Sequence, residues 1–328
     1  MYFVIKNIWK MVIFVMFISL MACSQSSTEP PSKDDPVNPP EIPSDPPEIP
    51  LTSDSYLGRQ APGLTAVRFV PDYLLSNQNW WWHGKVDFLD DGKEMFMDIY
   101  CPAEGGTRIR HMKLENDIWS APATSPISSQ YTDACPSFID NGAKVFFISD
   151  RPNGSNYGYW NSTKTNNTWS APAPVIVPAA ASLGGGWEIS ATNDETLYVR
   201  MDLIGGTTGL DLYIIRKVNG LYVQPERLDN NINSSYDELG VFVDPEGDYM
   251  LFESNRPGGS GGSDIYISFR NTDGSFRQSQ NLGSSVNSSS NENAPSVSSD
   301  GRYLFFLSER QGDRNPFWID ARIIENLR

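Results

Sequence analysis

Apolar and polar residues alternate along most of the chain in a repeated arrangement of two short strands joined by a tight polar turn. Each repeat has an apolar strand, a turn rich in Asp, Asn or Gly, and a second strand of alternating apolar residues. Such turns between apolar runs predict β-hairpins, because these turn residues adopt the positive φ angles that a tight turn requires. The five segments are residues 86–96, 138–147, 189–199, 241–252 and 297–306.

The turns recur at a nearly constant period. Successive aligned turn residues are 50, 52, 53 and 54 positions apart. Asp replaces Gly in the third turn, where it is expected to adopt the same backbone conformation, since Asp reaches positive φ more readily than most residues. The aligned residues are Gly92, Gly142, Asp194, Gly247 and Gly301. This period predicts a fold built from repeated β units.

Each repeat also contains two further strands. A third strand follows each turn and is clearest at residues 210–215 and 264–269. A fourth strand with an aromatic residue is expected before each following repeat, at residues 118–122, 168–172, 221–225 and 275–278. Four strands in a unit of about fifty residues are typical of a β-propeller blade.

The two ends of the repeat region predict how the ring closes. After Gly301 the chain has a third strand at residues 317–321 and no fourth. An apolar segment at residues 64–71 lies where a fourth strand would precede the first repeat. We therefore expect an all-β fold, a five-bladed β-propeller of four-stranded blades over residues 56–328. The N-terminal strand near residues 64–71 would complete its last blade.

The first fifty-five residues differ from the rest of the chain. Residues 1–22 have the form of a secretory signal peptide, with Lys6 and Lys10 beside an apolar run at residues 11–18. That run is too short to span a bilayer as a mature helix. Residues 23–55 include nine prolines and few apolar residues, which predicts a disordered tether before the propeller.

The end of the signal, Leu20-Met21-Ala22-Cys23, resembles the lipobox of bacterial lipoproteins. The resemblance implies cleavage before Cys23 and acylation of that residue, which would anchor the protein in a membrane. Ser24 rather than Asp follows the cysteine, which in lipoproteins favours sorting to the outer membrane. We therefore expect an outer-membrane-anchored lipoprotein of the bacterial cell envelope that faces the periplasm or the cell surface.

Composition and charge limit the possible partners. The apolar fraction of 39% allows a sizeable core, while 26 Gly and 24 Pro disfavour long helices. The formal charge of −15 includes −6 over residues 24–54 and −11 over residues 55–328. The acidic folded part argues against nucleic acid as a partner, because a phosphate backbone requires a basic surface.

Three repeats share a Ser-x-Arg core after the second strand, at residues 148–154, 253–259 and 307–312. Together with residues 295–301 and Asp264-Ile265-Tyr266, these segments resemble the WD40-like (PD40) propeller repeats, the family of TolB-like propellers and many envelope lipoproteins. The resemblance implies the fold but no particular function. TolB has six blades and a separate N-terminal domain, and this sequence supports neither. We expect the repeated Arg151, Arg256 and Arg310 to pair with acids or carbonyls within each blade, and Asp264 to anchor its hairpin.

One end of the ring carries the candidate binding residues. The segments that lead into the first strands hold aromatic and acidic residues, which would meet at the channel mouth if every blade projects them inward. Such a mouth suits a glycan, since sugar C–H faces stack on rings and hydroxyl groups donate to carboxylates. Alternatively, the tryptophans fill gaps between blades and the acids are solvated loop residues. The candidates are Trp80, Trp81, Trp82, His83, Asp133, Trp187, Glu188, Asp237, Glu238 and Glu292.

The other reactive residue types are few. Only His83 and His111 are present, and the cysteines are not clustered, so we expect neither a metal nor another cofactor. Cys101 and Cys135 would lie toward the same rim of neighbouring blades. The sequence is compatible with either a disulfide between these two residues or two separate buried thiols.

The sequence favours a non-enzymatic binding or scaffold module, anchored to a membrane by lipid, whose partner is a glycan or an envelope protein. The alternative is a glycoside hydrolase or lyase, which needs an acid and a base or nucleophile about 5–10 Å apart. Asp87, Asp133, Glu188 and Glu238 are candidates for such channel carboxylates. A third hypothesis is a purely structural assembly protein. Convergence of three of these acids on one channel end, beside tryptophan, would favour the two sugar hypotheses.

Overall fold

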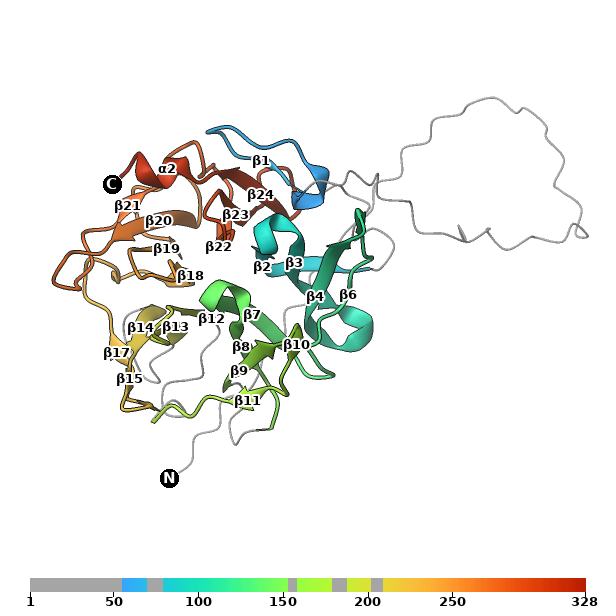
Figure 1. Cartoon of the computed structure of the whole chain (residues 1–328). Coiled ribbons are helices and arrows are strands. Elements are labelled where there is room, and N and C mark those ends of the chain that lie inside the picture. Colours follow the sequence, from blue (N-terminus) through green and yellow to red (C-terminus); the bar gives the residue numbers. More distant parts are fainter. Residues whose placement is uncertain (1–54, 70–78, 153–157, 179–187, 202–208) are drawn as a thin grey trace, which may run out of the picture. The chain divides into compact units, whose positions relative to one another are not determined.

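The computed structural model describes residues 55–69, 79–152, 158–178, 188–201 and 209–328. Within them, five antiparallel sheets form a ring in which the first strands of neighbouring sheets contact one another around a common axis (Figure 1). This confirms the prediction of an all-β, five-bladed β-propeller. The predicted signal peptide, Cys23, nearly all of the tether and Trp187 lie outside the described residues.

The blades are numbered in chain order, and their strands are counted outward from the axis. The first strands are β2 (Trp81–Leu89), β7 (Asp133–Ile139), β12 (Glu188–Ala191), β18 (Glu238–Val243) and β22 (Glu292–Val297). The second strands are β3 (Glu94–Cys101), β8 (Lys144–Ser149), β13 (Leu197–Met201), β19 (Tyr249–Ser254) and β23 (Tyr303–Ser308). The third strands are β4 (Gly106–Glu115), β9 (Gly158–Thr165), β14 (Asp211–Ile215), β20 (Asp264–Phe269) and β24 (Asn315–Asp320).

The fourth strands are short. They are β6 (Ala123–Thr124), β11 (Ala173–Pro174), β17 (Glu226–Arg227), β21 (Gln280–Asn281) and, in the last blade, β1 (Val67–Arg68). The helical elements are also short: η1 (Tyr56–Gly58), η2 (Asp90–Gly92), η3 (Pro102–Glu104), η4 (Asp140–Gly142) and α2 (Arg322–Glu325). Among the described residues, no helix has the length and apolar character needed to cross a membrane.

The predicted turns join the first and second strands. Gly92 and Gly142 have φ angles of 80° and 81°, as the turn chemistry requires. In the third turn the residue with positive φ is Glu195, at 62°, and not Asp194. Asp194 instead accepts hydrogen bonds from the Thr192 hydroxyl (2.6 Å) and the Thr196 N–H (3.0 Å), so its side chain closes the turn.

The fourth strands begin later than predicted. Trp119 and Trp169 lie in β5 (Ile118–Trp119) and β10 (Thr168–Trp169), which fold back on the ends of β4 and β9. Tyr222 likewise lies in a hairpin between β15 (Lys217–Val218) and β16 (Leu221–Tyr222), and Phe276 forms a bridge with Arg270. Each true fourth strand starts four residues after the aromatic residue. The reason is a turn with positive φ two or three residues before each of the four aromatic residues, as at Asn116, which reverses the chain before the fourth strand begins.

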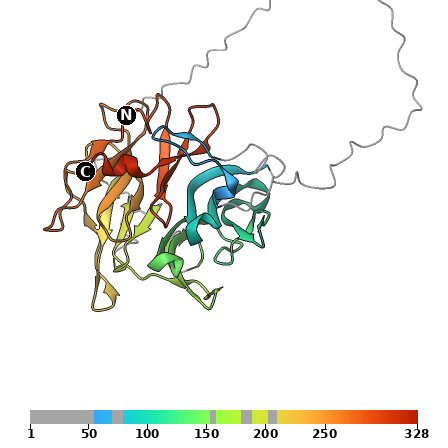
Figure 2. The same ribbon diagram turned by 45° about the horizontal axis from the view of Figure 1, so that its top comes forward.

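The predicted closure is confirmed. β1 pairs antiparallel with β24, with Val67 opposite Trp318 and Arg68 opposite Phe317, and both views place these strands side by side (Figure 2). The Phe69 N–H donates to the carbonyl of Pro316 at 2.9 Å. The buried Phe69 ring packs against Trp318 and against Phe88 of the first blade. The N-terminal strand therefore joins the last blade to the first.

Candidate functional site

Three of the predicted acids lie in buried ion pairs. Asp133, Glu238 and Glu292 each begin a first strand and have no exposed surface. Their carboxylates lie 3.1, 2.9 and 3.1 Å from the guanidinium groups of Arg151, Arg256 and Arg310, respectively. The same arginines donate to the carbonyls of Ile127, Ile232 and Val286, on the loops that enter each blade.

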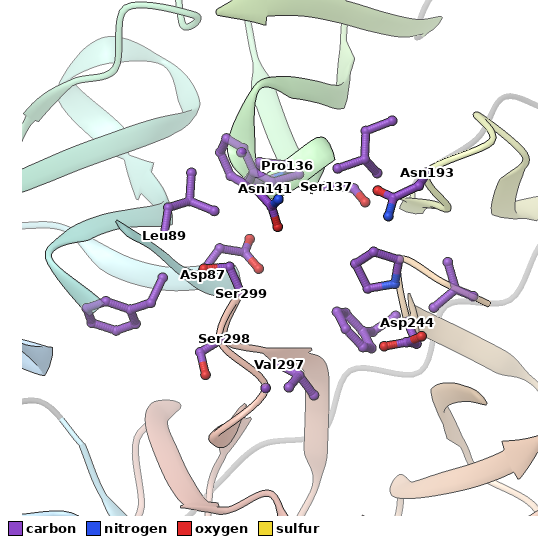
Figure 3. A pocket seen from close by; sticks show the side chains of 18 of the residues that line it. Asp87, Leu89, Pro136, Ser137, Asn141, Asn193, Asp244, Val297, Ser298 and Ser299 are labelled. Atoms are coloured by element: carbon purple, nitrogen blue, oxygen red, sulfur yellow. The ribbon is translucent and has the colours of Figure 1, made fainter. Parts of the chain in front are cut away.

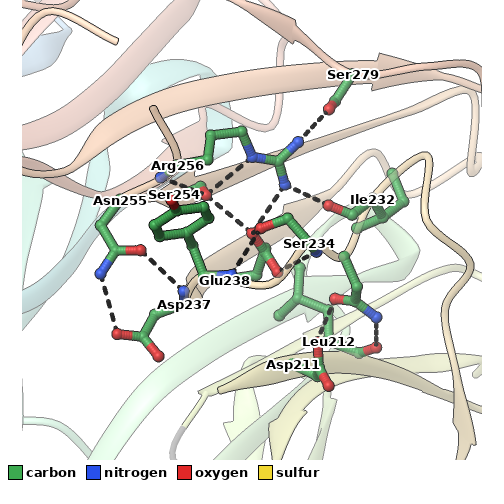
Figure 4. Close-up of polar contacts among 12 residues, drawn as sticks. Asp211, Leu212, Ile232, Ser234, Asp237, Glu238, Ser254, Asn255, Arg256 and Ser279 are labelled. Atoms are coloured by element: carbon green, nitrogen blue, oxygen red, sulfur yellow. Dashed lines mark hydrogen bonds and ion pairs between the residues drawn. The ribbon is translucent and has the colours of Figure 1, made fainter. Parts of the chain in front are cut away.

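These pairs confirm the expected within-blade role of the arginines. Figure 4 shows the blade-4 network, in which Glu238 also accepts hydrogen bonds from Ser254 (2.9 Å) and from both the N–H and hydroxyl of Ser234. Asp237, the next candidate, is half-buried and accepts from the side chain of Asn255 at 3.0 Å. These acids fasten each first strand to its entry loop. Asp264 similarly accepts hydrogen bonds from Gly261 and Asn281 and holds its hairpin as predicted.

The first blade departs from this pattern. In blades 2, 4 and 5 the acid stands nine residues before the turn glycine and the arginine nine residues after it. In blade 1 these positions hold His83 and Cys101. His83 therefore has no matching arginine, and its side chain is exposed. Partial burial lowers the pKa of His83, against the opposing effect of the nearby Glu188 carboxylate, so the neutral imidazole is favoured near pH 7.

The three consecutive tryptophans point in different directions, as strand alternation requires. Trp82 is buried in the core that joins blades 5 and 1. Trp80 is half-buried with its ring under the guanidinium of Arg110, 4.2 Å from the ring centroid. Trp81 is 49% exposed, and its ring stacks on Tyr100 with the centroids 4.9 Å apart. Of the three, only Trp81 offers a large free aromatic face.

Trp81, His83 and Glu188 together define what we call the strand-start mouth, the end of the ring where the first strands begin. Trp81 and His83 share the exposed face of β2, and Glu188 opens β12 in blade 3. Glu188 is half-buried, and its carboxylate lies beside the Cys135 thiol, whose pKa is raised by burial and by the charge of Glu188. His83 lies close enough to Glu188 for the carboxylate to affect the pKa of the imidazole, and Trp81 lies at the same end of the ring, where β2 begins.

Two buried acids in the channel wall were not predicted. Asp98 and Glu253 occupy equivalent positions, six residues after their turn glycines, where blades 2 and 5 have Ile148 and Leu307. Asp98 accepts a hydrogen bond from the Cys135 N–H at 2.6 Å, and Glu253 one from the Ala294 N–H at 3.1 Å. Each acid therefore fastens the irregular first strand of the next blade. The sequence signal was a charged residue at an otherwise apolar repeat position.

Burial controls the ionisation of both acids. It raises the pKa of Asp98 well above the usual range and that of Glu253 to about 7, and the nearby charge of Glu188 adds to both shifts. The hydrogen bonds from the backbone act in the opposite direction. Both carboxyl groups near Glu188 therefore hold their protons to a higher pH than an exposed acid does.

Lys85 crosses the channel close to Asp98. Its side chain is 1% exposed, and its ammonium donates to the carbonyl of Ile189 at 2.9 Å. Lys85 belongs to blade 1 and Ile189 to blade 3, which are not neighbours in the ring. The lysine thereby ties two blades together across the axis.

A pocket of about 210 Å³ lies at the opposite end of the ring, where the hairpin turns meet (Figure 3). All five blades contribute to it, and we call it the turn-end pocket. Its apolar wall includes Leu89, Phe242 and Val297, and its polar groups include Asp87 and Asn141. Figure 3 shows the Asp87 carboxyl group directed into the pocket.

Asp87 breaks a second repeated pattern. The strand register gives blades 2, 3 and 5 a serine at the position of Asp87, namely Ser137, Ser190 and Ser296. Each serine hydroxyl bonds the first strand of the next blade, at distances of 2.9, 2.9 and 2.5 Å. Asp87 Oδ2 is buried and makes no hydrogen bond within the described residues. Burial raises the pKa of Asp87 to about 7 despite the opposing charge of Lys85.

The remaining sequence questions concern cysteines and metals. Cys101 and Cys135 are both buried, and no disulfide joins them. Across the described part of the chain, no group of three or more His, Cys, Asp or Glu residues is arranged to hold a metal ion.

The sequence matches no protein-family model. No curated protein matches it either. Among solved structures, it is similar to a Fusarium graminearum GH93 α-L-arabinofuranosidase (10% identity, TM-score 0.48, 78% of this chain and 80% of that chain). It is also similar to TolB from Acinetobacter baumannii (16%, TM-score 0.45, 70% of this chain), of which it spans 51%. A Penicillium chrysogenum α-L-arabinanase gives 14%, a TM-score of 0.43 and coverages of 74% and 75%. At these identities, the likenesses bear on no ligand or reaction.

Proposed function

We propose that this propeller is a lipid-anchored binding module of the bacterial cell envelope that recognises a glycan at the strand-start mouth. The observation that carries the proposal is the Trp81 ring, which is 49% exposed and stacks on Tyr100 at the end of the ring where β2 begins.

The surrounding groups suit a sugar. The Trp81 ring offers a flat surface for the C–H face of a pyranose or furanose. The half-buried Glu188 carboxylate supplies an acceptor for sugar hydroxyl groups, and the neutral His83 imidazole can both donate and accept.

The test is a glycan-array screen of the full chain, followed by affinity measurements with each glycan that binds. Trp81→Ala should weaken binding about tenfold through the lost stacking surface. Leu221→Ala, which removes an exposed apolar side chain from the outer rim, is the matched control and should bind normally. If no glycan binds and crosslinking instead recovers an envelope protein, the scaffold hypothesis replaces this one.

Membrane anchoring is tested separately. With the native Cys23, the protein should incorporate labelled fatty acid and sediment with outer membranes. Cys23→Ala should abolish both while leaving glycan affinity unchanged. Sedimentation of the variant with membranes would contradict lipid anchoring through this residue.

A glycoside hydrolase or lyase is the second candidate, and one observation favours it. Glu188 lies close enough to Asp98 and Glu253 for its charge to raise the pKa of both groups, so three carboxyl groups lie near one another. Enzymes that cleave glycosidic bonds use a pair of carboxyl groups, one as the acid and the other as a base or nucleophile. Release of new sugar ends from a bound glycan, lost in Glu188→Gln, would support this candidate. Intact glycan after prolonged incubation would exclude it for that ligand.

A further inference from the structure

We propose that the turn-end pocket is a second binding site, distinct from the strand-start mouth, which takes a primary ammonium group carried on a short alkyl chain. The occupant belongs to the chemical class of a lysine side chain or a small diamine. This inference goes beyond the proposed glycan site and does not depend on it.

The first argument is the unusual placement of Asp87. Three other blades use a serine there to bond the next blade, and that serine serves the ring alone. In blade 1 a carboxyl group takes this position, and its Oδ2 atom is buried without a hydrogen-bond partner in the described structure. Asp87 therefore does not fasten the next blade through this atom as the serines do, and its carboxyl group is directed into the pocket.

The second argument is the shape and chemistry of the pocket. A volume of about 210 Å³ admits a small molecule or one long side chain but not a folded segment. Leu89, Phe242 and Val297 supply apolar wall that suits methylene groups, while the Asp87 carboxyl group is directed inward. A flexible alkyl chain with a charged end matches this division of surfaces.

The third argument is charge. The ionisable groups of the lining are the acids Asp87, Asp244 and Glu246 against the single cation Lys85, apart from the phenol of Tyr249. The ammonium of Lys85 is already bonded to the carbonyl of Ile189 on the far side of the axis. The pocket therefore has a surplus of negative charge, which an ammonium ligand would compensate and an anionic ligand would oppose.

The test is calorimetric titration of the full chain with cadaverine, a five-carbon diamine, at about pH 8, where carboxylate and ammonium are both ionised. Pentanol, which has the same chain length and no charge, is the matched ligand control. Cadaverine should bind, and pentanol should bind at least about 30-fold more weakly, as expected for the loss of a buried charge pair. Equal binding of the two compounds would overturn the proposal.

Asp87→Ser is the decisive variant, because it installs the residue that three other blades carry at this position. It should fold normally, which thermal unfolding checks, and lose cadaverine binding; Asp87→Asn serves as a neutral variant of the same size. Trp81→Ala, at the other mouth, should bind cadaverine normally. Unchanged affinity in both Asp87 variants would refute the site.

The two sources of the ammonium group are then separated with a blocked amino acid, N-acetyl-lysinamide. Binding of this compound to the wild-type chain assigns the pocket to a lysine side chain of a partner. Binding of cadaverine alone assigns it to a free diamine. Failure of both compounds to bind would reject the proposed ligand class, whatever the result at the glycan mouth.

Discussion

The ammonium of Lys85 donates a 2.9 Å hydrogen bond to the carbonyl oxygen of Ile189, and this contact joins the first and third blades across the channel. Its positive charge also lowers the pKa of Asp87 and Asp98, against the larger effect of burial. One buried side chain thus contributes both to the ring and to the ionisation of its channel.

Lys85→Met should destabilise the protein by about 1–3 kcal/mol. The substitution leaves the Ile189 carbonyl without its donor and removes the positive charge that lowers the pKa of Asp87 and Asp98. Urea unfolding measures the effect, and Lys93→Met, at an exposed position in the adjacent hairpin, is the control. Equal stability of the two variants would show that the cross-channel contact contributes nothing.

Arg256→Met should cost about 3 kcal/mol, because it leaves the fully buried Glu238 carboxylate without its counter-ion. The control is Arg216→Met, which removes an ion pair with Glu226 at the surface and should cost less than about 1 kcal/mol. Chemical unfolding of both variants gives the comparison. A cost for Arg256→Met as small as the control's would mean that the serine contacts suffice to hold Glu238.

Glu253→Gln should alter how stability depends on pH. Burial raises the pKa of Glu253 to about 7, so the wild-type protein is most stabilised when this group is protonated, below its unfolded-state pKa. That stabilisation is lost as the pH rises through about 7. The side chain of the variant is always neutral. Its free energy of unfolding should therefore increase relative to that of the wild type between pH 5 and pH 8, by at most about 3 kcal/mol. A parallel pH dependence of thermal unfolding in the two proteins would contradict this assignment.

Phe69→Ala should cost about 3–5 kcal/mol, since this buried ring packs against both the last and the first blade. Val67→Ala, in the same strand but 44% exposed, should cost far less. Thermal unfolding distinguishes them. Similar, small effects would mean that the N-terminal strand is dispensable for closure.

The blade count and the closure follow from sequence because the turn residues recur with a period of 50 to 54. The fourth strands begin five residues after their predicted starts, because the hairpins of Trp119 and Trp169 also consist of an aromatic strand beside a polar turn. A local pattern does not distinguish a hairpin on the third strand from a true fourth strand. That distinction depends on pairing partners brought together by the fold.

Residues that recur from repeat to repeat indicate the scaffold, whereas residues that depart from the repeat indicate the candidate sites. Asp133, Glu238 and Glu292 recur in register with arginines, and the fold places them in buried pairs. His83 and Asp87 have no counterpart of the same type in the other blades; the first is exposed at one mouth and the second faces the opposite pocket. Repeated residues here build blades, whereas the exceptions in the first blade lie at the two ends of the channel.

The most direct test of the central claim compares the wild-type chain, Trp81→Ala and Asp87→Ser on a glycan array. Glycan recognition at the strand-start mouth predicts that the wild type binds a defined set of glycans. Trp81→Ala should lose most of that signal, and Asp87→Ser, at the other end of the ring, should retain it. Undiminished glycan binding by Trp81→Ala, or no glycan binding by the wild type, would contradict the account.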